Sequence, residues 1–194
     1  ADEGLILSNA SAQSAAVTAT YDGLEVINFL AAGATGVKTA LVDTSLTLAS
    51  ADLEKVVVTG ASNANLTVNL AGAALETQTS EFDASAAGGI ITAHVTKGAS
   101  ATATVTMSAQ DDYLDYNGAL ANTATLDGGT GTDTLELDTD IAYSAATATA
   151  GLTQAGAGIS NFEVLRLATG TDVDERAIAN NAGITNVISV AGGS

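Results

Sequence analysis

The chain has 194 residues, of which 22 are Asp or Glu and only 5 are Lys or Arg, so its formal net charge at pH 7 is −17. This charge argues against nucleic acid as a partner, because nucleic-acid binding rests largely on clustered Lys and Arg, and it repels anionic membrane surfaces. The absence of Cys excludes disulfides and thiol chemistry, and no run approaches the roughly 20 continuous apolar residues of a membrane-spanning helix.

Short segments that alternate apolar and polar residues, separated by Gly, Asn, Asp and Ser, occur along much of the chain. Such segments, rich in Val, Thr and Leu, are typical of β-strands. In chain order, the sequence predicts strands over 17–21, 56–59, 66–70, 101–107 and 134–137. We therefore expect an all-β protein.

The composition of these strands indicates how they stack. Only 4% of the residues are aromatic, so Ala, Thr, Val and Leu must fill the inward positions. A thin core of small side chains favours a parallel β-helix, or β-solenoid, over a β-sandwich, whose two wide sheets usually need bulkier filling. The absence of Pro agrees with strands that are paired on both sides. We predict a single β-solenoid-like unit over 1–194, with a β-sandwich as the alternative.

Two approximate internal repeats run through the chain. In the shorter one, Glu25, Glu54 and Glu163 each precede apolar residues two and four positions further on. Because positions two apart share a face of a strand, each Glu lies at the edge of a buried stripe, where we expect it to cap backbone N–H groups rather than bind metal. A longer repeat aligns 2–7 with 133–137, so it begins near residue 2 and again near residue 133.

One motif carries a chemical expectation. Segment 128–136 fits the nonapeptide G-G-x-G-x-D-x-U-x at every specified position, with Leu135 as the apolar residue U. Glycine tolerates left-handed turn conformations and lets carbonyl oxygens converge, and Asp133 adds a carboxylate. Ca²⁺ takes about six to eight oxygen ligands of this kind. The motif therefore predicts a calcium site that includes Gly129, Gly131 and Asp133.

A degenerate copy of the motif precedes it. Segment 110–115 preserves the acidic half of the unit but lacks the glycines. Two nonapeptides would separate their aspartates by about 18 residues, whereas 133 − 112 = 21, so we expect a bulged coil. We predict that Asp112 and Asp133 flank one Ca²⁺ ion, with Asp111 and Asp127 as further candidate ligands; the alternative is a set of solvated turn residues with no ion. Asp133→Ala should then lower thermal stability only when calcium is present.

The G-G-x-G-x-D unit at 128–133 resembles the RTX repeat of proteins exported by type I secretion. Together with the Thr- and Ala-rich strands, segments 80–85 and 158–165 resemble the repetitive region of Caulobacter-type surface-layer (S-layer) proteins. The resemblance implies a secreted, calcium-binding β-solenoid that assembles into a lattice or filament at the cell surface. The chain departs from an RTX array because it has one complete nonapeptide and one degenerate copy.

The sequence does not favour an enzyme. His94 is the only His, and it alternates with Ala93 and Val95, so we expect it to face solvent rather than act as a base or ligand. No G-x-S-x-G or H-E-x-x-H motif occurs. The charged cluster at 172–176 could be imagined in a polysaccharide-degrading β-helix enzyme, but adjacent charges of this kind are more typical of a solvated loop.

A second non-catalytic function stays open, namely a calcium-stabilised adhesin or biofilm-matrix module that binds a cell-surface glycan. Retention of a soluble glycan would favour the adhesin, and sheets or filaments formed in calcium would favour the surface layer. At the ends of the sequence, we favour the interpretation that the chain is a fragment of a longer repetitive protein. The alternative, for the surface layer, is that subunits meet head to tail, with 192–194 of one subunit beside Asp2 of the next.

Overall fold

The computed structural model describes residues 4–8, 17–20, 26–31, 46–50, 53–70, 79–97, 102–117, 124–138, 158–168 and 183–189. Within these ranges the chain forms two sheets of β-strands and no α-helix, which confirms the all-β prediction. The same ranges contain no helix long and apolar enough to cross a membrane.

Seven strands form one sheet, in the spatial order β1 (Gly4–Ser8), β3 (Val26–Leu30), β5 (Lys55–Gly60), β7 (Thr79–Ala87), β9 (Thr102–Thr106), β11 (Thr125–Asp127) and β13 (Ile159–Ser160). Eight strands form the other, in the order β2 (Val17–Thr20), β4 (Leu46–Ser50), β6 (Ala64–Leu70), β8 (Ile91–Lys97), β10 (Tyr113–Asn117), β12 (Thr134–Leu137), β14 (Val164–Leu167) and β15 (Asn186–Ser189). Every described strand pair is parallel, and neither sheet closes on itself.

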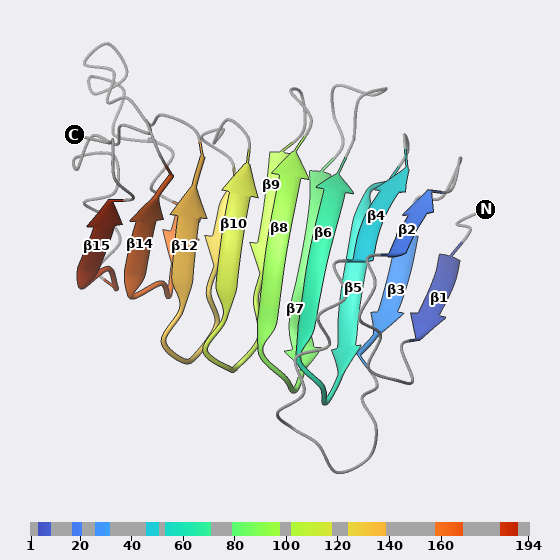
Figure 1. Cartoon of the computed structure of the whole chain (residues 1–194), viewed down its shortest axis with the longest axis horizontal. Coiled ribbons are helices and arrows are strands. Elements are labelled where there is room, and N and C mark those ends of the chain that lie inside the picture. The colour runs from blue at the N-terminus through green and yellow to red at the C-terminus, as the bar shows by residue number, and fades with distance from the viewer. Residues whose placement is uncertain are drawn as a thin grey trace.

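Successive strands from β1 to β14 alternate between the two sheets. We use the word layer for one strand of the seven-stranded sheet together with the strand of the eight-stranded sheet that follows it. The layers succeed one another from β1 at one end to β14 and β15 at the other, and the strands of the two sheets point in opposite directions (Figure 1). Strands that pair within a sheet therefore belong to neighbouring layers.

The predicted strands are confirmed. The five predicted segments coincide with β2, β5, β6, β9 and β12, each to within one or two residues at its ends. The two aligned segments of the longer repeat lie in different sheets, because β1 belongs to the seven-stranded sheet and β12 to the eight-stranded sheet.

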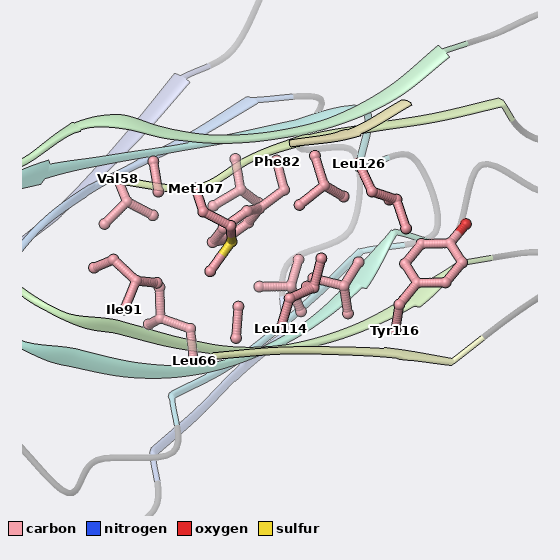
Figure 2. Close-up of a cluster of buried hydrophobic side chains, with 14 of the residues drawn as sticks. Val58, Leu66, Phe82, Ile91, Met107, Leu114, Tyr116 and Leu126 are labelled. Atoms are coloured by element: carbon pink, nitrogen blue, oxygen red, sulfur yellow. The ribbon is translucent and has the colours of Figure 1, made fainter. Parts of the chain in front are cut away.

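The core lies between the two sheets. Inward side chains at alternate strand positions meet there, as Figure 2 shows for Val58, Phe82, Met107 and Leu126 on one side and Leu66, Ile91, Leu114 and Tyr116 on the other. All three Phe residues of the chain are buried, and aliphatic side chains and Ala supply nearly all the rest. A core of this composition holds the strands at a regular spacing and positions the turns that connect them.

Short turns lead from the seven-stranded sheet to the eight-stranded sheet along one edge of the molecule. We call this edge the turn edge; among the described residues it consists of 61–63, 88–90, 107–112, 128–133 and 161–163. Backbone hydrogen bonds join these turns to neighbouring layers, for example from Gly88 N–H to the Gly60 carbonyl (2.7 Å) and from Gly128 N–H to the Ser160 carbonyl (3.0 Å). The predicted calcium-binding residues all lie on or beside this edge.

Candidate functional site

The complete motif and its degenerate copy form two stacked turns of the turn edge. The turn 107–112 links β9 to β10, and the turn 128–133 links β11 to β12. Met107 N–H donates to the Asp127 carbonyl oxygen (2.8 Å), and Thr134 N–H donates to the Asp112 carbonyl oxygen (2.9 Å). The structure thus brings the two halves of the predicted site into neighbouring layers.

The prediction of a bulged coil between these turns is wrong. Asp112 and Asp133 are 21 residues apart, and the same separation relates Ile91 to Asp112 and His94 to Asp115 in the layer before. Strands β8, β10 and β12 pair with no shift of register. A spacing of 21 residues is therefore the regular length of a layer in this part of the chain, which is longer than two nonapeptides.

The glycines of the motif are required by the stacking of the turns. Gly129 and Gly131 have φ angles of +92° and +138°, which residues with a side chain rarely adopt. A Cβ atom on Gly129 would overlap the carbonyl oxygen of Ser108, and one on Gly131 would crowd that of Gln110. The glycine pattern therefore has a structural purpose even without an ion, so the pattern alone does not discriminate between a calcium site and bare turns.

Carboxylates at one position of successive layers form a column of hydrogen bonds. Asp112 Oδ1 accepts the N–H of Ile91, Asp133 Oδ1 accepts the N–H of Asp112, and Glu163 Oε2 accepts the N–H of Asp133, each at 2.7 Å. Each side chain thus bonds the backbone of the preceding layer. The expectation that Glu163 caps a backbone N–H group is confirmed, whereas Glu25 lies outside the described residues.

Asp112 and Asp133 are the two buried charged residues of the described chain, with exposed fractions of 2% and 0%. Asp112 is fully engaged, because its Oδ2 accepts both the N–H and the hydroxyl of Ser108, each at 2.7 Å. The role of Ser108 as the partner of Asp112 was not predicted from the sequence. It could have been suspected, because a hydroxyl residue stands four positions before Asp112, where the motif has glycine.

Asp133 differs from Asp112 in the hydrogen bonding of its second carboxylate oxygen. Asp133 Oδ2 is buried and has no hydrogen-bond partner. A buried carboxylate oxygen without a donor is costly in free energy, and a bound cation is one partner that would satisfy it. Burial raises the pKa of the Asp133 carboxyl to about 6 and also raises the pKa of Asp112, because water solvates neither charge well.

The other two predicted aspartates lie at the same stacked turns and hold them together. Asp111 Oδ1 accepts the N–H of Thr132 from the next layer (2.8 Å). Asp127 Oδ1 accepts the N–H of Gly129 (3.0 Å) and the side-chain amide of Asn161 (2.7 Å). Asn161 was missed by the sequence analysis, although its φ of +57° is typical of Asn in a turn.

The donor set limits what a metal site here could contain. Among the described residues, no group of three or more His, Cys, Asp and Glu side chains is placed to hold a metal ion. Asp133 has one unpartnered carboxylate oxygen, and Gly129 and Gly131 lie in the same turn. A metal site here would need backbone carbonyl and water oxygens besides this carboxylate, which is a kind of mixed donor set that Ca²⁺ accepts.

The remaining predicted positions lie elsewhere. The His94 side chain is on the outer face of the eight-stranded sheet, opposite the buried Ala93 and Val95, and is 40% exposed, as its alternation predicted. The cluster at 172–176 and both ends of the proposed head-to-tail contact, Asp2 and 192–194, lie outside the described residues. No protein-family model, no curated protein and no solved structure matches this chain.

Proposed function

We propose that the chain is a β-solenoid with RTX-like calcium turns, and that it serves as a non-catalytic structural protein of the cell exterior that assembles in calcium into a surface layer or filament. The observation that carries the proposal is the buried Asp133 carboxylate, which bonds the neighbouring turn through Oδ1 and has no partner for Oδ2. Calcium would bind at this oxygen and at oxygens of the stacked turns 107–112 and 128–133.

Two further observations support this function. The alternation of successive strands from β1 to β14 between two parallel sheets supports a chain wound in solenoid layers. The net charge of −17 destabilises a compact chain through repulsion, and a bound divalent cation offsets part of that charge. A protein that meets abundant calcium outside the cell can carry such an excess of carboxylates.

The calcium site is tested by the substitution Asp133→Asn. Alanine is a poor test, because it would leave the Asp112 N–H without its acceptor and so lower stability even without calcium; the expectation from sequence that Asp133→Ala acts only in calcium is revised accordingly. Asparagine keeps an acceptor oxygen and removes the charge. We expect saturating calcium, at about 100 times its Kd, to stabilise the wild type by about 2.7 kcal/mol and to leave Asp133→Asn nearly unchanged.

The measurement is thermal unfolding with calcium and with chelator, together with calorimetric titration of calcium. Asp138→Asn is the matched control, because it removes one carboxylate charge at an exposed position five residues away. The control variant should keep the wild-type gain. If Asp133→Asn also keeps that gain, Asp133 is not a calcium ligand.

Self-assembly requires an end of the molecule that can receive another subunit. Val187 and Ile188 of the edge strand β15 are 56% and 44% exposed, the largest values among the exposed large hydrophobic side chains in the described part of the chain. Val187 is the register partner of Leu165, which is buried, so it continues an inward column that no further described strand covers. An uncovered apolar column beside an open sheet edge favours end-to-end stacking.

Electron microscopy of the purified chain in calcium and then in chelator tests the assembly. We expect sheets or filaments in calcium that disperse in chelator. Particles that stay monomeric while calorimetry shows bound calcium would contradict self-assembly and leave the calcium site intact, so the two parts of the proposal fail separately.

A further inference from the structure

Four ionisable side chains form a straight row on the outer face of the eight-stranded sheet. His94 of β8, Asp115 of β10, Glu136 of β12 and Arg166 of β14 are direct register partners on four successive strands. Their inward neighbours on each strand are buried, except Leu167, which is partly buried, so the row faces outward. The two carboxylates therefore stand side by side in the middle, with one basic residue on each flank.

Each carboxylate is linked to its own basic neighbour. His94 Nδ1 lies 2.7 Å from Asp115 Oδ2, and Arg166 Nε lies 3.2 Å from Glu136 Oε2. Glu136 Oε2 also accepts the hydroxyl of Tyr113. Like charges on directly opposed strand positions repel, so the row depends on both flanking cations.

The two flanks differ in chemistry. The Arg166 guanidinium stays charged at any pH a protein meets, whereas an imidazole loses its charge close to neutral pH. Asp115 also has fewer partners than Glu136, because its Oδ1 is buried without a hydrogen bond. The negative charge of Glu136 is therefore always balanced by Arg166, whereas the negative charge of Asp115 is balanced only while His94 is protonated.

From these contacts we propose that the His94–Asp115 pair is a proton-controlled link between neighbouring layers of the stack, which strengthens the contact between β8 and β10 when His94 is protonated. This link is separate from the calcium turns, which lie on the turn edge rather than on the outer face. The imidazole of His94 takes up the proton from solvent, and its positive charge then balances the negative charge of Asp115.

The charged groups around His94 favour its protonated form. His94 faces Asp115 of β10 and forms a T-shaped ring pair with Tyr113 of the same strand. The charges of Glu136, on β12, and of Asp138, just after it, also act on His94. Its register partner on β6 is the uncharged Thr67. The hydrogen bond to Asp115, with the three nearby carboxylates, raises the pKa of His94 from its usual 6.5 against the opposing effect of burial.

The raised pKa of His94 determines how stability changes with pH. A base whose pKa is higher in the folded state stabilises the fold fully below the unfolded pKa and loses this contribution as pH rises through the folded pKa. With His94 charged, two cations face the three carboxylates Asp115, Glu136 and Asp138; with it neutral, only one does. The stack should therefore loosen at β8 and β10 as the pH rises above 6.5 and through the raised pKa of His94.

The chain offers a direct test, because its only His gives a single imidazole signal in NMR. We expect the pKa of His94 in the full chain with chelator to exceed 6.5 and to fall in Asp115→Asn. Asp138→Asn is the matched control, since it removes the same charge without a contact to the ring, and it should lower the pKa less. A pKa at or under 6.5, or an equal fall in both variants, would overturn the link.

Stability provides the second measurement. The unfolding midpoint of the wild type should exceed that of His94→Gln at about pH 5, and the difference should shrink by about pH 8. Comparing the two proteins at each pH cancels the titration of the other carboxylates. A difference that stays constant across this range would also overturn the proposal.

Discussion

Replacing Gly129 with alanine should lower the free energy of unfolding by about 2 to 4 kcal/mol. Two costs combine at this position. The φ of +92° is unfavourable for any residue with a Cβ atom, and the new methyl group would overlap the Ser108 carbonyl oxygen of the neighbouring turn. The turns 107–112 and 128–133 would have to separate to relieve this overlap, so the variant should also weaken the proposed calcium site.

Denaturant unfolding in chelator measures the structural cost alone. Gly88→Ala is the control, because a Cβ atom there would lie 3.5 Å from the nearest heavy atom, the Ala61 Cα, which is ordinary contact. That change should stay within about 0.5 kcal/mol of the wild type. Equal losses in the two variants would show that stacking at Gly129 is not the cause.

The second large effect is expected in the core. Phe82 is fully buried on β7 and is the register partner of Val56 on one side and Val105 on the other. Phe82→Ala removes a whole ring from between aliphatic neighbours, which cannot collapse without shifting the strand register. We expect a loss of about 3 to 5 kcal/mol in the free energy of unfolding.

Thr104→Ala on the neighbouring strand β9 is the control for Phe82→Ala. Thr104 alternates with the buried Ala103 and Val105, so its side chain lies on the outer face. Its loss should change the free energy of unfolding by about 0.5 kcal/mol or less. If Phe82→Ala proves as mild as this control, the core around β7 is less tightly packed than the structure indicates.

Several features of the fold could be predicted from the sequence because they depend on neighbouring residues alone. An alternation of period two identifies strands and their buried faces, and it placed β5, β6, β9 and β12 within one or two residues. The same alternation placed His94 on the outer face. The scarcity of aromatic residues predicted a core of small side chains, and among the described residues Phe29, Phe82, Phe162 and Tyr116 add aromatic rings to it.

The site could be predicted only in outline. The motif located the turn at 128–133 and paired Asp133 with Asp112, which the structure joins by a hydrogen bond. It did not reveal that Asp112 is saturated by Ser108 while Asp133 keeps one free oxygen, because these partners come from the packing of the turns.

The strands, their inward faces, the acidic charge and the glycine turn are predictable before folding, since each follows from local residue order or from composition. The register between layers is not, because it depends on how distant strands stack. The hydrogen bonds from the Asp112 N–H to the Asp133 carboxylate and from the Asp133 N–H to the Glu163 carboxylate span 21 and 30 residues, because the connections between strands differ in length while the stacked strands keep one spacing. That common spacing, and not separation in sequence, also sets His94 beside Asp115 and Glu136 beside Arg166.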